Sequence, residues 1–111
     1  MRKFHRERGQ RRAFIKGLAH NLIMKERINT TVARAKSIRP VTERLVSIAK
    51  KQNVAALRLL ISRVNKTAAQ KLYYEIAPRY KERHGGYLRI IKSAKVRQRD
   101  GSPMAMIEFI K

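Results

Sequence analysis

Apolar residues between Arg11 and about Glu26 recur at the three- and four-residue spacing of an amphipathic helix. We therefore predict a first helix over 11–26, on which cations occupy the positions off the apolar stripe. The four residues that follow, 28–31 (Ile-Asn-Thr-Thr), are short and β-prone, and they predict a single strand. The apolar stripe of the first helix consists of Phe14, Ile15, Leu18, Leu22 and Ile23.

A second helix is predicted after this strand, because either Thr30 or Thr31 can accept the first free backbone N–H groups. Pro40 lies inside its apolar pattern and lacks a backbone donor, so the helix is expected to kink there or to restart with Pro40 in a first turn. The apolar positions of this helix are Ala35, Ile38, Val41, Leu45 and Ile48.

Two shorter helices are predicted next. Asn53 can cap the first of them, which carries Leu57, Leu60, Ile61 and Val64. Thr67 followed by Gln70 matches a capping box and would open the second, and Pro78 is expected to end it. The apolar residues of that helix are Ala69, Leu72, Tyr73 and Ile76.

The C-terminal third contains two β-rich runs, 87–91 and 104–110, with a turn at Asp100-Gly101 between them. An early strand that joins a late hairpin, with helices on one side, predicts a two-layer α+β domain. The predicted order is helix, strand, three helices and two strands, with a small mixed sheet packed on the helices. Residues 1–10 are predicted to be a basic N-terminal arm and residues 11–111 a single domain.

The charge of the chain restricts its possible binding partners more than its length does. Lys and Arg number 28 against 7 Asp and Glu among 111 residues, which gives a net charge of +21. Such a surface needs a polyanion opposite it, and the candidates are nucleic acid, an acidic membrane or an acidic protein. With 43% hydrophobic residues the chain is too apolar for a wholly disordered basic tail, so a folded core is expected.

Several kinds of chemistry are excluded or disfavoured. There is no cysteine, which removes disulfides and thiol chemistry, and no apolar run is long enough to span a bilayer. His5, His20 and His84 have no metal-ligand spacing, and the seven carboxylates are scattered among excess cations, so we expect neither an enzyme nor a metal or other cofactor. The start of the chain has no signal-peptide pattern, and a cytoplasmic protein is expected.

The predicted binding residues are cations in the arm, at the start of the second helix and between residues 79 and 99. Arginine outnumbers lysine 16 to 12, which favours forked recognition of phosphates. Gly85-Gly86 is interpreted as a turn with positive φ that also lets a phosphate backbone approach the main chain. The set is Arg2, Lys3, Arg6, Arg8, Arg11, Arg12, Arg34, Lys36, Arg39, Arg79, Lys81, Arg83, Gly85, Gly86, Arg89, Lys92, Arg97 and Arg99.

Other positions have more ordinary interpretations. Lys50, Lys66 and Lys71 are interpreted as solvated surface cations. Most aromatic residues fit core positions, and only Tyr80 and Tyr87, which lie among arginines, are candidates for contact with nucleic acid. The basic first helix could lie on an anionic membrane, but the rest of the domain needs its apolar stripe for a core.

Three segments together resemble the bacterial large-subunit ribosomal protein family numbered seventeen. They are residues 28–40, the sixteen residues from Ala77 to Lys92, and residues 100–105, in the same order over essentially the whole chain. Family members usually carry a further basic stretch before the segment that matches residues 3–6. The resemblance implies a non-enzymatic constituent of the large subunit that binds ribosomal RNA, in contact with neighbouring ribosomal proteins near the mouth of the exit tunnel.

Two other classes of function stay open on the sequence. A sequence-independent DNA-compacting protein could share this size and charge, and so could a protein that binds acidic partners. No small-molecule substrate is expected for any of the three.

Overall fold

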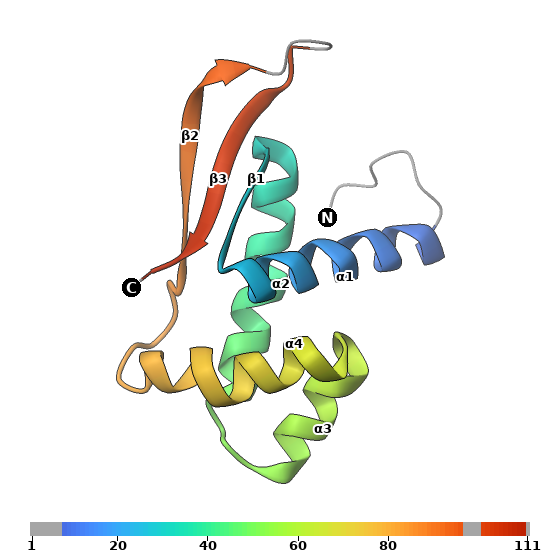
Figure 1. Ribbon diagram of the computed structural model, residues 1–111, viewed down its shortest axis with the longest axis vertical. Coiled ribbons are helices and arrows are strands. Elements are labelled where there is room, and N and C mark those ends of the chain that lie inside the picture. Colours follow the sequence, from blue (N-terminus) through green and yellow to red (C-terminus); the bar gives the residue numbers. More distant parts are fainter. Residues whose placement is uncertain (1–7, 97–100, 111) are drawn as a thin grey trace.

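The computed structural model describes residues 8–96 and 101–110 of the chain, as a layer of helices beside a three-stranded sheet (Figure 1). The expected α+β class and two-layer arrangement are confirmed. The elements are α1 (Arg8–Lys25), β1 (Arg27–Thr31), α2 (Val32–Ala49), α3 (Val54–Arg63), α4 (Lys66–Lys71), a π-helical turn η1 (Leu72–Ile76), a 3-10 turn η2 (Ala77–Tyr80), β2 (Leu88–Val96) and β3 (Pro103–Phe109).

Helix α1 begins at Arg8, three residues earlier than the apolar pattern indicates, and the residue that follows its last turn has positive φ. Glu26 has φ 65° and its N–H donates to the carbonyl of Leu22 at 2.7 Å. Left-handed backbone at a helix end is usually glycine, because a Cβ disfavours it. Here the carboxylate of Glu26 forms ion pairs with Arg79 and Lys71, and Lys71 also donates to the Met24 carbonyl at 2.6 Å.

Helix α2 starts where the sequence indicates, because the Thr31 side chain accepts the Arg34 N–H at 3.2 Å. Pro40 lies within one continuous helix from Val32 to Ala49, so of the two expected alternatives, a kink or a restart, the restart is ruled out. Both Pro40 and Lys36, whose carbonyl loses its usual helical donor, lie on the exposed side of α2. Water can therefore replace the missing hydrogen bond.

The expected cap of α3 is confirmed, and the expected cap of α4 is wrong. Asn53 accepts the Ala56 N–H at 2.7 Å, as predicted. In α4 the cap is Asn65, which accepts the Ala68 N–H at 2.9 Å, rather than Thr67, which lies inside the helix. Asn65 also donates its side-chain amide to His20 Nδ1 at 2.9 Å, a tertiary contact that the local sequence pattern does not contain.

The helical path after α4 does not end at Pro78. It continues through η1 and then η2, in which Pro78 occupies an early position. Proline lacks only a backbone donor that a first turn leaves free, so it is compatible with the start of a new 3-10 turn. The path ends after Tyr80.

The sheet has the order β1-β3-β2, and both pairs are antiparallel. The mixed sheet expected from the sequence is therefore wrong: both neighbours of the central strand run opposite to it, and the direction of such distant pairing is not encoded in local patterns. Ile28, Ile107 and Ile90 are paired in one rung that faces the helices. The hairpin extends past the first turn of α2 (Figure 1). Gly101 has φ 67°, as expected for the turn, while Asp100 lies outside the described residues.

The core lies between the helices and the inner face of the sheet. Its fully buried side chains include Leu22, Ile38, Leu72 and Ile107, which come from α1, α2, η1 and β3 in that order. Thr42 lies completely buried among them, and its hydroxyl has no hydrogen-bond partner among the described residues.

Candidate nucleic-acid interface

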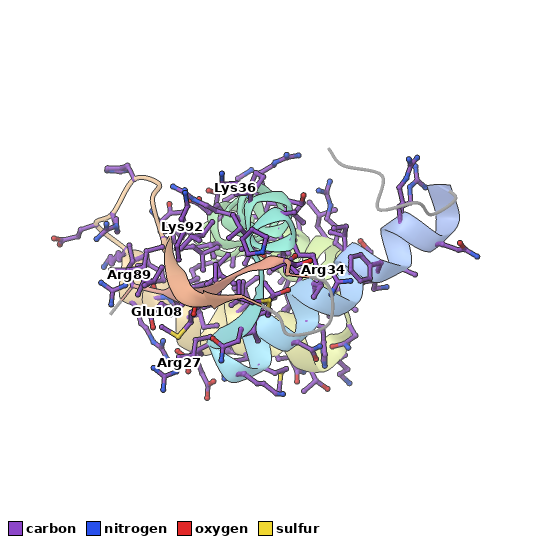
Figure 2. All side chains as sticks on the ribbon, turned by 90° about the horizontal axis from the view of Figure 1, so that it is seen from above. Arg27, Arg34, Lys36, Arg89, Lys92 and Glu108 are labelled. Atoms are coloured by element: carbon purple, nitrogen blue, oxygen red, sulfur yellow. The ribbon has the colours of Figure 1, made fainter. Side chains whose placement is uncertain are left out.

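Cations lie on both sides of the sheet. Figure 2 shows Lys36 of α2 and Lys92 of β2 together on one side, while Arg27 and Arg89 lie on the other side with Glu108. Lys36 and Lys92 are exposed and form no ion pair among the described residues. Their charges therefore remain available for an anion.

The outer face of the sheet carries one carboxylate between two arginines. Arg27 and Arg89 both pair with Glu108 in the register of the strands, and Arg89 Nε donates to Glu108 Oε1 at 2.7 Å. The Glu108 side chain is 14% exposed and that of Arg89 is 57% exposed. This rung therefore keeps a net positive charge at the surface, and Ile91, two residues further along β2 on the same face, is exposed beside it.

The segment from Lys81 to Gly86, which we call the basic loop, is exposed along its whole length. Gly85 and Gly86 have φ values of 88° and 63°, so the expected positive-φ turn is confirmed. Arg83 Nε donates to the Gly86 carbonyl at 3.1 Å and closes the loop. A phosphate could approach the backbone here, because the space around both glycine Cα atoms is nearly empty.

Side chains of α2 fix the base of the basic loop. Lys50 Nζ donates to the Tyr87 hydroxyl at 3.0 Å and to the Arg83 carbonyl, and Glu43 Oε2 accepts the Tyr87 N–H at 3.2 Å. The interpretation of Lys50 and Lys71 as solvated surface cations is therefore wrong, because both are half-buried and bond to backbone carbonyls. Lys66 is exposed as expected.

The two tyrosines of this region belong to the core. Tyr80 is 4% exposed and Tyr87 is 2% exposed, and their rings lie 5.2 Å apart. Burial raises the pKa of Tyr80, whose hydroxyl donates to the Ile110 carbonyl. Both rings are buried, so the structure does not favour either of these candidates as a platform for stacking a base.

Three of the predicted RNA-binding arginines form ion pairs within the domain. Arg39 Nε lies 3.0 Å from Glu43 Oε1, Arg89 pairs with Glu108, and Arg79 pairs with Glu26. The hydrogen bond from Arg79 holds the pKa of Glu26 below its ordinary value, against the effect of burial, and the pair also raises the pKa of Arg79. Each guanidinium has five N–H donors, so a paired arginine still has donors for a phosphate.

The other predicted residues are distributed as follows. Arg11 and Arg12 lie on α1, and the guanidinium of Arg34 lies 5.0 Å from the centre of the Phe14 ring. Arg2, Lys3, Arg6, Arg97 and Arg99 lie outside the described residues, and nothing is described of the Arg8 side chain. The structure thus brings the second-helix cations near the sheet, and one of them, Arg34, also contacts α1.

Exposed cations that the sequence analysis did not single out include Lys16, Arg27, Arg44 and Arg63. The strand pattern contained a signal for Arg27, since it alternates with Ile28 and so points to the opposite face of the sheet. For the others the signal was helical periodicity, because each lies next to an apolar core position.

The described residues contain no group of three His, Asp or Glu residues that could hold a metal ion, and none of their helices is long and apolar enough to cross a membrane. These features define a small, strongly basic α+β domain whose exposed cations greatly outnumber its carboxylates.

Comparison with known proteins identifies the family. Residues 14–110 match the family described as Ribosomal protein L17. A protein named Large ribosomal subunit protein bL17 from Persephonella marina is 51% identical, over 98% of this chain and 90% of its own length. Proteins of the same name from Orientia tsutsugamushi and a Sulfurihydrogenibium species are 47% and 43% identical, over 98% of this chain and 75% and 91% of their own lengths.

The chain belongs to the ribosomal protein L17 family. The resemblance described from the sequence is thereby confirmed, and so are the expectations of a ribosomal protein and of a non-enzymatic role. Bacterial ribosomes lie in the cytoplasm, so the cytoplasmic location expected from the sequence is confirmed.

Proposed function

We propose that this chain is a structural constituent of the large ribosomal subunit that binds large-subunit ribosomal RNA mainly through phosphate contacts. The observation that carries the proposal is the set of exposed cations on α2, the sheet and the basic loop, of which Lys36, Lys81 and Lys92 have no ion-pair partner among the described residues. The proposal also includes the cations predicted in residues 1–10, together with Arg97 and Arg99.

Neighbouring ribosomal proteins near the mouth of the exit tunnel belong to the same proposal. The resemblance implies this location, and chemical crosslinking of assembled subunits followed by mass spectrometry tests it. Crosslinks from this chain only to proteins far from the tunnel mouth would contradict the location and leave the RNA contacts standing.

The test of RNA binding is a salt titration of affinity for full-length large-subunit ribosomal RNA. Each neutralised phosphate contributes about 0.7 to 0.9 to the slope of log affinity against log salt, so about six contacts produce a steep decline. A nearly flat titration would reject the proposal.

Substitution of cations distinguishes RNA contacts at the sheet from attraction by the overall charge of the protein. The pair Lys36→Gln and Lys92→Gln removes two unpaired cations at the sheet, and the pair Arg58→Gln and Lys66→Gln removes two exposed cations elsewhere. We expect the first pair to lower the salt slope by about 1.5 and the second to change it little. Equal effects of the two pairs would mean that the sheet surface is not the contact.

A DNA-compacting protein is the second candidate, since its charge requirement is the same. The same titration with duplex DNA of matched length distinguishes the two. Preference for structured ribosomal RNA at every salt concentration supports the proposal, and equal affinity for both favours DNA compaction.

A further inference from the structure

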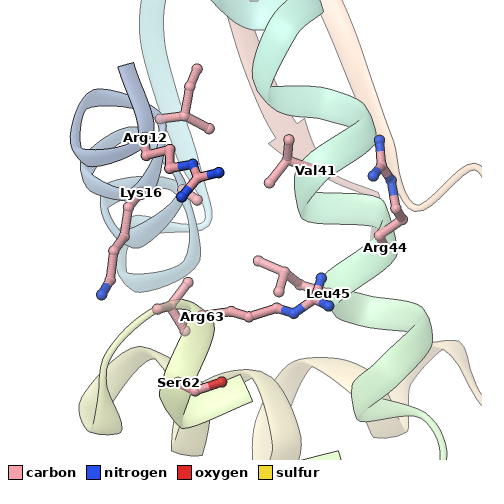
Figure 3. Close-up of a pocket in the computed structure, with 10 residues that line it drawn as sticks. Arg12, Lys16, Val41, Arg44, Leu45, Ser62 and Arg63 are labelled. Carbon is pink, nitrogen blue, oxygen red and sulfur yellow. The ribbon is translucent and has the colours of Figure 1, made fainter. Parts of the chain in front are cut away.

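Three helices enclose a cleft of about 820 Å³ on the side of the domain formed by α1 and α3. Figure 3 shows it between α1 and α2, with the end of α3 below. Its volume is that of a typical small-ligand site. The floor is apolar and is built from Ile15 and Ala19 of α1, Val41 and Leu45 of α2, and Val64.

The rim of the cleft carries four cations and no carboxylate among the described residues that line it. Arg12 and Arg63 extend into the space between the helices, and Lys16 and Arg44 stand at its edges (Figure 3). Of the four, only Arg12 belongs to the predicted binding set. None of them forms an ion pair with any described carboxylate.

Helical periodicity explains why the cleft has this composition. Arg12, Ile15, Lys16 and Ala19 follow the three- and four-residue spacing along one side of α1, so apolar residues and cations alternate along one wall. On this wall Ile15 and Ala19 are buried, while Arg12 and Lys16 are exposed. Across the cleft, Val41 of α2 remains half-buried and faces the open space.

An apolar floor beneath a cationic rim complements one kind of group, an unstacked nucleotide of RNA. Its base has an apolar face that can lie on aliphatic side chains or on a guanidinium plane, and the phosphates on either side need cations. Three of the four rim cations are arginines, which bind phosphate through paired N–H donors. A paired RNA helix would meet only the rim, because its bases are stacked inside.

We propose that this helical cleft binds an extruded, unpaired nucleotide of ribosomal RNA, with Arg12 and Arg63 on its phosphates and Val41 beneath its base. This inference rests on the proposed function and adds to it a pocket for one nucleotide. It assigns binding roles to Lys16, Arg44 and Arg63, which lie away from the sheet surface.

The test compares a 20-base-pair RNA duplex with the same duplex that carries one bulged nucleotide. Wild-type protein should bind the bulged RNA about fivefold more tightly, since burial of about 40 Å² of apolar base surface at about 25 cal/mol per Å² corresponds to that factor. The double variant Arg44→Gln, Arg63→Gln should bind both RNAs equally. Both arginines are exposed, and thermal unfolding checks that the variant remains folded.

A matched control removes two positive charges, one just after α2 and one on α3. Lys51 follows α2 and Arg58 lies on α3, both are exposed, and neither lines the cleft. The control variant Lys51→Gln, Arg58→Gln should keep the preference for the bulged RNA while losing some affinity for both. If the control loses the preference as well, or if wild-type protein shows none, the cleft does not hold a nucleotide.

The outcomes keep this inference separate from the proposed function. Wild-type protein that binds ribosomal RNA steeply with salt but shows no preference for the bulge overturns the cleft proposal alone. An acidic protein as the occupant would show as a cleft variant with unchanged RNA preference but weakened retention of another subunit protein in reconstituted particles, and that result also overturns it.

Discussion

Thr42 is a polar residue at the centre of an otherwise apolar core. Its side chain is completely buried, and its hydroxyl lacks a partner among the described residues. A buried donor or acceptor without a partner costs about 1 to 3 kcal/mol. The core therefore contains one position at which a residue of similar shape should improve stability.

We expect Thr42→Val to raise the free energy of unfolding by about 1 kcal/mol, because it replaces the hydroxyl with a methyl group of similar size. Thermal or urea unfolding measures the change. The control is Thr42→Ala, which lacks both γ-methyl groups of valine and should lose about 2 kcal/mol relative to Thr42→Val through the smaller buried volume. Destabilisation by Thr42→Val would show that the hydroxyl is bonded in solution.

Glu26 combines a disfavoured backbone conformation with two ion pairs. Its carboxylate lies 3.5 Å from Lys71 Nζ and pairs with Arg79, and the hydrogen bond from Arg79 lowers its pKa. A carboxyl group with a lowered pKa stabilises the fold above its ordinary value of 4.5, and this stability is lost as pH falls through the folded-state pKa.

We expect Glu26→Gln to lower stability at pH 7 by at most about 1 kcal/mol, because both partners are partly exposed to solvent. The variant should also lose less stability than wild type when the pH falls below 4.5, the ordinary pKa of the carboxyl group. Unfolding measured between pH 7 and pH 3 tests both statements. Glu26→Gly should be more stable than Glu26→Gln, since glycine accepts a φ of 65° without a Cβ penalty.

At the scale of elements, α2 fixes the basic loop through Lys50. Burial tends to raise the pKa of Tyr87, but the hydrogen bond from Lys50 and further bonds to the phenol outweigh it, so the pKa is lowered overall. Loss of the ammonium group should therefore affect both the loop and this phenol.

We expect Lys50→Met to raise the pKa of Tyr87 and to speed amide hydrogen exchange in residues 83–87. Methionine keeps most of the side-chain length but donates no hydrogen bond. Ultraviolet titration of the tyrosines measures the pKa, and Tyr87→Phe identifies which transition belongs to Tyr87. An unchanged titration in Lys50→Met would contradict the contact.

The glycine turn of the basic loop makes a further element-scale prediction. Gly86→Ala should cost about 1 kcal/mol of stability, since its φ is 63° and a new Cβ meets only the Arg83 guanidinium at 4.0 Å. If RNA packs on this backbone, affinity should fall further than the unfolded fraction explains. Arg89→Ala, measured by the same unfolding and RNA-binding assays, is the comparison that removes charge without backbone strain.

The elements that the sequence predicted well are those with local causes. Apolar periodicity and single capping residues such as Thr31 and Asn53 act within one helical turn, so they placed α2 and α3 closely. The cap of α4 was wrong because Asn65 and Thr67 are both competent caps, and the choice between them includes a contact with His20, 45 residues away. The continuation of α2 through Pro40 likewise depends on which side of the helix faces water.

The sequence predicted where cations gather on the candidate surface, but it did not predict which of them form ion pairs or hydrogen bonds within the domain. Runs of cations in the sequence located the basic loop and the start of α2. The sequence could not show that Arg79 would pair with Glu26, 53 residues away, or that Lys50 would fix the loop. Such contacts depend on how distant elements pack, which only the folded chain defines.

The net charge of the whole molecule has a consequence for its stability without RNA. At +21 the folded chain repels itself, because this net charge remains after all seven carboxylates are counted, including those that form the four ion pairs among the described residues. Salt screens charges beyond about 8 Å at physiological ionic strength.

We therefore expect the thermal midpoint of the free protein to rise as sodium chloride increases from about 10 mM to about 300 mM, since the screening length falls over this range. Differential scanning calorimetry measures it, and potassium chloride at equal ionic strength is the control for ion identity. A midpoint that falls with both salts would show that the ion pairs outweigh the general repulsion.

The strand order determines when the fold can form during synthesis. Arg27 pairs with Glu108, and β1 has no partner in the sheet other than β3. A nascent chain therefore makes β1, three helices and β2 before any rung of the sheet can close. Closing so large a loop slows folding. We therefore infer that the helices assemble first and that β3 pairs last, between β1 and β2.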